Sequence, residues 1–330
     1  MKFFLIFIFT VLISPLVSYA DTRIITVAKQ GGDFSNIVDA VNSITDAESN
    51  NRYVVSVGPG LFFLNGQQIN MKPFVSLVGA GENSTFIQSF AVSSSSLNTG
   101  CGVISLVGDS TVESLTIQNI GVDAGSTLTS CGLEVRVSGR DRMVRNVRVI
   151  VRGRGREKIG LLNRSSIDQL ENVSILVENF TGDATGIELV GPILDASNVD
   201  VRIRASAVSN SIGVLLDTGS INLDGGSIVA GDFAITTRGD IAGVVLNNVS
   251  LVGEVAYLES FFDEPLAFTT AARMNNIRTS GIFDFNNNPN TRVTNSEFTP
   301  RVGTSEVIVN DIAGKQCSNV VGADLELIDC

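Results

Sequence analysis

The sequence contains no histidine and no tryptophan, and only seven of its 330 residues are proline. Without histidine, a serine–histidine catalytic triad is excluded, and a zinc site of the usual kind lacks its most common ligand. Any catalysis would therefore depend on carboxylates, arginine or lysine. Acidic residues outnumber basic ones by 34 to 23. This excess argues against nucleic acid as a general partner.

Long apolar runs are also missing after residue 20. The one such run, from Phe3 to Val17, follows a single lysine and ends in Ser18-Tyr19-Ala20. This pattern predicts a secretory signal peptide over residues 1–20, because the run is too short for a stable membrane span. We expect a secreted protein, located outside the cell, at the cell surface or in the periplasm. The sequence predicts no membrane span and does not indicate an oligomeric state.

A pattern repeated every 26 residues dominates the centre of the chain. Its copies are Val-Arg-Asn-Val-Arg-Val-Ile-Val (144–151), Leu-Glu-Asn-Val-Ser-Ile-Leu-Val (170–177) and Ala-Ser-Asn-Val-Asp-Val-Arg-Ile (196–203). Each copy follows a shorter apolar segment that we expect to open at a glycine: Gly132, Gly160 or Gly186. A fixed period of this length is typical of a solenoid, in which each repeat buries its apolar face against its neighbours.

Alternating apolar residues in the copies predict strands, because every second side chain of a strand lies on the same side. The aligned positions are Val147, Val149 and Val151, then Val173, Ile175 and Val177, then Val199, Val201 and Ile203. No segment of helical length separates the copies. The predicted fold class is therefore all-β, a parallel β-helix of about nine to ten coils forming a single domain over residues 21–330.

Asparagine precedes the apolar strand in several coils. It occupies positions 146, 172, 198, 248 and 276. Asparagine tolerates the left-handed backbone of a sharp corner, and stacked copies can form a ladder of amide hydrogen bonds. The alternative is that Asn-Val is a common junction between a turn and a strand.

Near the N-terminus, apolar residues at helical spacing predict one amphipathic helix over residues 34–45, with Asp33 or Ser35 as its N-cap. At the end of a solenoid, such a helix would cover apolar core and strand edges that the first coil leaves open.

The four cysteines form an even number, as expected for an exported protein with disulfides. Cys101 and Cys131 each precede a glycine, so they should occupy equivalent points on adjacent coils, close enough for a disulfide. Cys317 and Cys330 would then close a small loop over residues 317–330. This pairing is one of three connectivities that four cysteines allow.

A resemblance strengthens the fold prediction. The segments ITVAKQGGDFSNIVDAVNSI, NRYVVSVGPGLF and KPFVSLVGAGENSTFI, within residues 24–88, resemble the N-terminal part of pectin methylesterases and of the pectin lyase-like superfamily. The resemblance implies a right-handed parallel β-helix and a relation to proteins that mostly act on acidic polysaccharides, such as those of cell walls.

The catalytic segments of these enzymes are missing. The sequence lacks the Gln-Asp-Thr-Leu, Val-Asp-Phe-Ile-Phe-Gly and Leu-Gly-Arg-Pro-Trp segments of pectin methylesterases. It also lacks the Gly-His-Gly segment of polygalacturonases and the Arg-x-Pro-x-x-Arg arrangement of pectate lyases. No catalytic residue can therefore be carried over from the resemblance.

Carboxylates in the central coils are the candidates for independent chemistry. Hydrolysis by an acid/base pair needs two carboxylates facing each other across a groove. The candidates are Asp168, Asp183, Asp195 and Asp200, with solvated turn residues as the alternative. We expect no cofactor and no metal. Calcium bound by stacked aspartate turns is the alternative, although no Asp-x-Asp-x-Asp-Gly loop occurs.

Basic residues concentrate in one region, with nine between Arg136 and Lys158. Arginine offers a planar fork suited to carboxylates and sulfates, so a row of arginines predicts a site for an acidic polysaccharide. The candidate ligand-binding residues are Arg136, Arg145, Arg148, Arg152, Arg164, Arg202 and Arg204. The alternative is a structural ladder of ion pairs, since Arg152, Glu178 and Arg204 should form one outward column of alternating sign.

Three hypotheses for the function follow. The first is a secreted β-helix that binds an acidic polysaccharide without the known pectinase machinery. The second is a lyase, esterase or glycosidase of unfamiliar subtype that acts on pectin-like uronans. The third is a structural or adhesive surface protein, whose arginines should all be paired with neighbouring acids.

Overall fold

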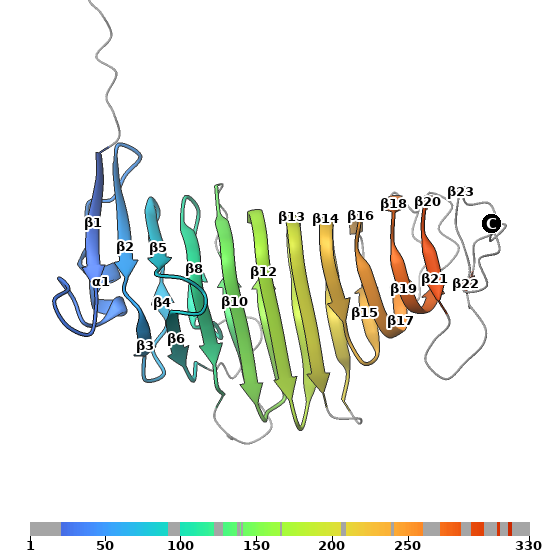
Figure 1. Cartoon of the computed structure of the whole chain (residues 1–330), viewed down its shortest axis with the longest axis horizontal. Helices are drawn as coiled ribbons and strands as arrows, with labels where there is room; N and C mark the ends of the chain where they lie inside the picture. Colours follow the sequence, from blue (N-terminus) through green and yellow to red (C-terminus); the bar gives the residue numbers. More distant parts are fainter. Residues whose placement is uncertain are drawn as a thin grey trace, which may run out of the picture.

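The computed structural model describes residues 21–91, 100–121, 128–136, 139, 141–165, 167–205, 209–238, 241–259, 271–284, 292–299, 309–310 and 316–318. The molecule is an elongated stack of short strands that run across its long axis (Figure 1). All strand pairings between the named strands are parallel, as a coil of successive rungs requires. The predicted all-β parallel β-helix is confirmed, and the predicted number of coils is roughly right.

One stack of strands runs the length of the molecule. It begins with β1 (Asp21–Val27), β2 (Asn51–Val57), β5 (Val75–Gly79), β8 (Thr111–Asn119), β10 (Met143–Gly153), β12 (Ile167–Asn179), β13 (Asp183–Ala205) and β14 (Ser211–Val229). It continues through β16 (Ile241–Asn247), β18 (Ala271–Asn275), β20 (Arg292–Thr294) and β23 (Gln316–Ser318), with β17 (Ser250–Glu259), β19 (Arg278–Asp284) and β21 (Glu297–Thr299) following the corner.

The remaining strands complete the coils. β3 (Gly60–Phe63) pairs with β6 (Thr85–Ser89), and β6 pairs with β8. On the other side, the order is β4 (Ile69–Asn70), β7 (Ile104–Leu106), β9 (Thr129–Val135) and β11 (Glu157–Asn163), then the first parts of β13 and β14, then β15 (Phe233–Thr237), β17, β19 and β22 (Val309–Asn310).

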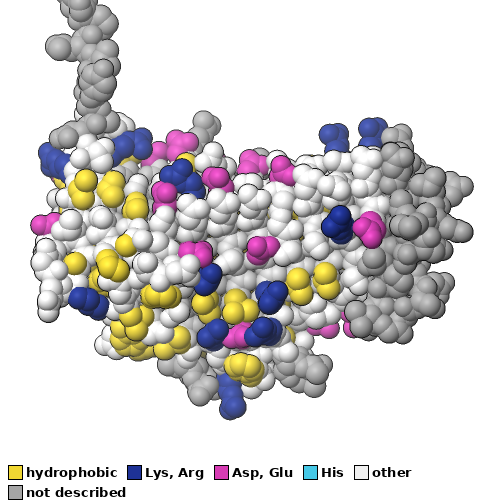
Figure 2. Space-filling view, in the orientation of Figure 1, with side chains coloured by type: hydrophobic (Ala, Val, Ile, Leu, Met, Phe, Trp, Pro, Cys, Tyr) yellow, Lys and Arg dark blue, Asp and Glu magenta, His cyan; other side chains and the backbone are white. Residues whose placement is uncertain are grey.

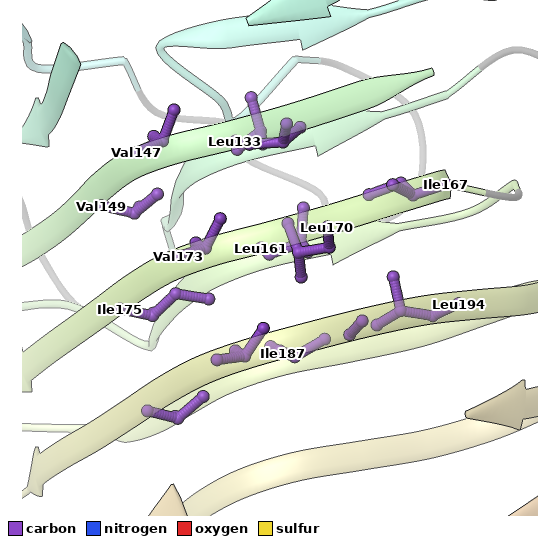
Figure 3. Close-up of a cluster of buried hydrophobic side chains, with 14 of the residues drawn as sticks. Leu133, Val147, Val149, Leu161, Ile167, Leu170, Val173, Ile175, Ile187 and Leu194 are labelled. Carbon is purple, nitrogen blue, oxygen red and sulfur yellow. The ribbon is translucent and has the colours of Figure 1, made fainter. Parts of the chain in front are cut away.

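The predicted repeat sets the register of the core. Val147 pairs with Val173, and Val173 pairs with Val199, so equivalent residues of successive copies lie on top of one another. All three are at most 2% exposed. Figure 3 shows the same stacking for Val149 above Ile175. The hydrophobic effect thus acts on the whole column, because each rung buries the apolar face of the next.

The glycines of the repeat do not open strands, which corrects the prediction. β9, β11 and β13 each begin three residues earlier, so Gly132, Gly160 and Gly186 lie inside them. The physical reason is space in the core. A Cβ atom at Gly160 would lie 2.2 Å from the Cγ2 atom of Ile175, and one at Gly186 would lie 2.2 Å from the Cγ1 atom of Val201.

The asparagine ladder is present. Asn146, Asn172 and Asn198 all have φ of 52°, in the left-handed region, at the corner before the apolar strand. The side-chain amide of Asn172 donates to Asn146 at 3.1 Å, and that of Asn198 donates to Asn172 at 3.1 Å. Asn276 likewise donates to Asn248. In the coils that carry these asparagines, the ladder fixes the corner before the apolar strand, whereas the coil of β14 has Gly225 at this position.

The N-terminal helix is shorter than predicted. α1 spans Ile37–Ser43, and its N-cap is Asn36, whose side chain accepts a hydrogen bond from the Val38 amide at 2.8 Å. Asp33 is not the cap because its carboxylate is held by Thr26, from the backbone amide and from the hydroxyl. α1 contacts β1, β2 and β4. Its role in covering the first coil stays a prediction.

The structure contains a disulfide between Cys101 and Cys131, with a Cα–Cα distance of 4.9 Å, one rung spacing. The predicted signal peptide over residues 1–20 and the predicted bond to Cys330 lie outside the described residues. Among the helices of the described part, none is long and apolar enough to cross a membrane.

Candidate functional site

A groove lies on the outer face of the solenoid, over the ends of β10, β12, β13 and β14. The strands that follow the asparagine corner point every second side chain into the core, so the side chains between them face outward. The side chains of this face border an open groove of about 470 Å³. Its lining residues are Arg148, Ile150, Arg152, Ser174, Ile175, Leu176, Asp200, Val201, Arg202, Arg204 and Ser227. Figure 2 shows the basic side chains gathered beside apolar ones in the middle of this face.

Three outward columns make the groove. The register stacks Arg148 on Ser174, Asp200 and then Ser227. Two residues further along each strand, Ile150, Leu176 and Arg202 form the second column. Arg152, Glu178 and Arg204 form the third. The groove therefore has an apolar centre with cationic side chains around it.

Glu178 holds two of the arginines in place. Its carboxylate accepts from the Nε atom of Arg152 at 2.6 Å and from the Nη1 atom of Arg204 at 3.0 Å. The Glu178 side chain is 11% exposed, whereas those of Arg152 and Arg204 are 51% and 61% exposed. The predicted column of alternating charge is thus present as an ion-pair ladder. It leaves the guanidinium groups accessible from solvent.

The other two arginines of the groove differ from each other. Arg148 donates a hydrogen bond at 3.0 Å to the carboxylate of Glu82, which lies in a turn far earlier in the sequence. Arg202 is exposed, and within the described residues it has no ion pair. The nearby carboxylate of Asp200 accepts a hydrogen bond from the hydroxyl of Ser227 at 2.6 Å. A ligand can therefore bind Arg202 without competing with an acidic partner among the described residues.

The remaining predicted arginines lie elsewhere. Arg145 precedes the asparagine corner and pairs with Glu113 at 2.8 Å. Arg136 follows β9 and pairs with the fully buried Glu134 at 2.6 Å. Arg164 follows β11, the strand that pairs with β9. The seven predicted arginines are thus divided among different faces, and the groove brings together only Arg148, Arg152, Arg202 and Arg204.

The four predicted aspartates do not stack on one another in the observed register. Asp168 accepts from the backbone amide of Arg142 at 3.0 Å, and Asp183 accepts from the backbone and side chain of Asn210. Asp195 is exposed and lies next to Asn222 of the adjacent strand β14, and Asp200 lies in the groove. None of these contacts forms an acid/base pair.

The sequence did not predict a group of carboxylates on the face that carries β11, β13 and β14, namely Glu157, Glu188 and Asp217. Burial is the main reason that the pKa of Glu188 is raised to about 7, and the negative charges of Glu157 and Asp217 add to the effect. Arg164 and Arg238 oppose it. Burial likewise raises the pKa of Glu157 and of Asp217.

The Oε2 atom of Glu188 is buried without a hydrogen-bond partner among the described residues. A signal for this carboxylate exists in the sequence, because Gly186-Ile-Glu188 repeats the pattern of Gly132-Leu-Glu134 two coils earlier. Within the described residues, no group of three potential ligands is arranged to hold a metal ion.

Comparisons with known proteins concern the fold. No protein family model matches the sequence, and no curated protein matches it. The structure is similar to that of pectate lyase Pel9A, with a TM-score of 0.51 at 16% identity, covering 94% of this chain and 80% of that one.

Two further solved structures match with lower scores. A pectin methylesterase in complex with a hexasaccharide has a TM-score of 0.39 at 14% identity, covering 94% of this chain and 92% of that one. Tailspike protein 2 of Escherichia coli O157:H7 bacteriophage CAB120 has a TM-score of 0.47 at 12% identity, covering 81% and 37%. Together with the observed coil of parallel strands, the likeness to pectate lyase Pel9A shows that the chain has a parallel β-helix fold.

Proposed function

We propose that the protein binds an acidic polysaccharide in the groove formed by Arg148, Arg152, Arg202 and Arg204, and that it does so as a secreted protein. The observation that carries the proposal is the exposed Arg202, which lies beside an apolar centre and has no ion pair within the described residues. A guanidinium binds a carboxylate or sulfate through two parallel hydrogen bonds, and sugars offer apolar C–H surfaces as well as charges.

The same contacts argue against a purely structural rod. In a rod, all arginines of the ladder should be saturated by acids. Among the described residues, the four arginines of the groove face three acidic side chains, Glu82, Glu178 and Asp200, and Asp200 accepts a hydrogen bond from Ser227. An anionic ligand would complete the charge balance of this surface at Arg202.

The test measures retention and affinity on polygalacturonate and heparin at low salt. Arg202→Ala should weaken binding about ten- to a hundredfold, since a hydrogen bond to a charged group contributes roughly 1.5 to 3 kcal/mol. Arg145→Ala is the control, because it removes the same charge from β10 at a position outside the groove. Equal losses in both variants, or no loss in Arg202→Ala, would refute binding in the groove.

A second candidate function is catalysis, and the observation that favours it is Glu188. A carboxyl group with a pKa of about 7 is suited to general acid catalysis of glycosidic bond cleavage or of related reactions on uronans. Incubation with pectins and alginates, followed by assays for unsaturated products, methanol and new reducing ends, tests this candidate. Activity that disappears in Glu188→Gln would support it, and a blank result with the wild-type protein would exclude it for these substrates.

A further inference from the structure

One outward column joins the groove to the N-terminal end of the solenoid. Phe63 of β3 pairs with Gln88 of β6, Gln88 pairs with Gln118 of β8, and Gln118 pairs with Ile150 of β10. The column then continues into the groove through Leu176 and Arg202. Neighbouring rungs are about 4.8 Å apart, so Phe63 lies roughly 24 Å from Arg202, five rung spacings away.

The chemistry of this column changes along its length. Phe63 is 50% exposed, and its ring lies 5.9 Å from that of Phe90. Next to it, the amide of Gln88 donates to the side-chain oxygen of Gln118 at 3.0 Å. Apart from this bond, the side chains of Gln88 and Gln118 make no hydrogen bond within the described residues. An aromatic ring, two fixed amides, an apolar stretch and a cation thus follow one another in a line.

The column has a wall on one side. The Thr116 hydroxyl donates to the backbone oxygen of Glu82 at 2.6 Å, and the Glu82 carboxylate accepts from Arg148. These bonds hold the turn containing Glu82 over the neighbouring outward column, where Thr116 is fully buried. The line from Phe63 to Arg202 runs beside this turn, and Figure 2 shows apolar side chains extending from the groove toward the N-terminal end of the face.

We propose that the acidic polysaccharide lies along the solenoid axis and continues from Arg202 across Ile150 and Gln118 to Phe63. This inference rests on the proposed function. The groove at Arg202 binds the carboxylate or sulfate, the amides of Gln88 and Gln118 hydrogen-bond to sugar hydroxyls, and the ring of Phe63 packs against the apolar C–H face of a distant sugar. A polyanion without hydroxyls and apolar faces would use only the cationic end.

The proposal predicts that affinity depends on ligand length. The probes are oligogalacturonates and heparin oligosaccharides of defined length, measured by calorimetry. Short oligomers reach only the arginine end, so Phe63→Ala and Gln118→Ala should bind them as the wild type does. Long oligomers span the column, and each variant should bind them several-fold more weakly. If only one of the two ligand series shows this dependence on length, that series indicates whether the anionic group is a carboxylate or a sulfate.

Two control variants remove similar side chains away from the column. Ile24→Ala truncates an apolar residue that is 66% exposed on β1, and Gln169→Ala removes an exposed amide of β12. Both should bind all oligomers normally. Unchanged affinity of Phe63→Ala and Gln118→Ala for long oligomers would overturn the proposal, as would equal losses for short ones. Arg202→Ala distinguishes a failure of this inference from a failure of the proposed function. If Arg202→Ala binds oligomers of all lengths as tightly as the wild type does, the proposed binding in the groove is itself refuted.

Discussion

The pH dependence of stability offers a direct test of the electrostatics around Glu188. The pKa of Glu188 rises from an ordinary value of 4.5 to about 7 in the folded protein, with burial as the main cause. In the unfolded chain the carboxyl group returns to its ordinary pKa. Between these two values the folded state therefore holds a proton that the unfolded state has released, so the free energy of unfolding must fall as the pH rises.

The size of the effect follows from the shift. Each pKa unit corresponds to about 1.36 kcal/mol, so a shift of this size lowers the free energy of unfolding by at most roughly 3 kcal/mol. The stabilising contribution of the protonated group is fully present below pH 4.5 and is lost as the pH rises through about 7. Glu157 and Asp217, whose pKa values are also raised, change stability in the same direction.

Glu188→Gln keeps the size of the side chain and removes the titration. We expect the variant to match the wild type near pH 4.5 and to be more stable at pH 8 by up to about 3 kcal/mol. Urea unfolding followed by far-ultraviolet circular dichroism at several pH values measures this, since the protein has no tryptophan fluorescence. Asp195→Asn, which removes an exposed carboxylate, is the control and should reproduce the wild-type profile. If Glu188→Gln shows the wild-type slope between pH 5 and 8, Glu188 is ionised in the folded protein and the reasoning is wrong.

Two further predictions concern the coil itself. Asn172→Ala should lower the free energy of unfolding by about 2 kcal/mol, because it places alanine at a φ of 52° and removes two ladder hydrogen bonds; an unchanged urea midpoint would contradict this. Gly186→Ala should lower the free energy of unfolding further, by roughly 3 kcal/mol, or prevent folding, since the added Cβ atom would lie 2.2 Å from the Cγ1 atom of Val201. Gly58→Ala, whose Cβ would make only ordinary contacts, is the control for thermal melting.

The central repeat shows how much of the fold could be predicted from the sequence. Identical spacing of Val147, Val173 and Val199 predicts both the strand and the stacking, because a shift by one residue would turn every apolar side chain to solvent. The asparagines that share φ values near 52° were also recognisable, since few other residues tolerate that backbone. Both signals are local and recur with the period, so they can be recognised without knowledge of the rest of the chain.

The candidate site could be predicted only in part. The outward direction of Arg148 and Arg152 follows from the alternation, and the stacking of Arg152 on Glu178 follows from the period. The partner of Arg148 could not be predicted, because Glu82 reaches it from a turn outside the central repeat. The raised pKa of Glu188 was also hidden, since it depends on how deeply three-dimensional packing buries that carboxyl group.

The sequence by itself determined the coil, because burying one apolar face per repeat leaves a single register in which like residues stack. It therefore also determined which arginines point outward on the strands after the asparagine corner. Only the tertiary structure decided which of them remain free, because each ion pair depends on turns and rungs that come from distant parts of the chain. For the same reason, the line from Phe63 to Arg202 exists only in the tertiary structure, because Phe63, Gln88 and Gln118 lie on strands outside the central repeat.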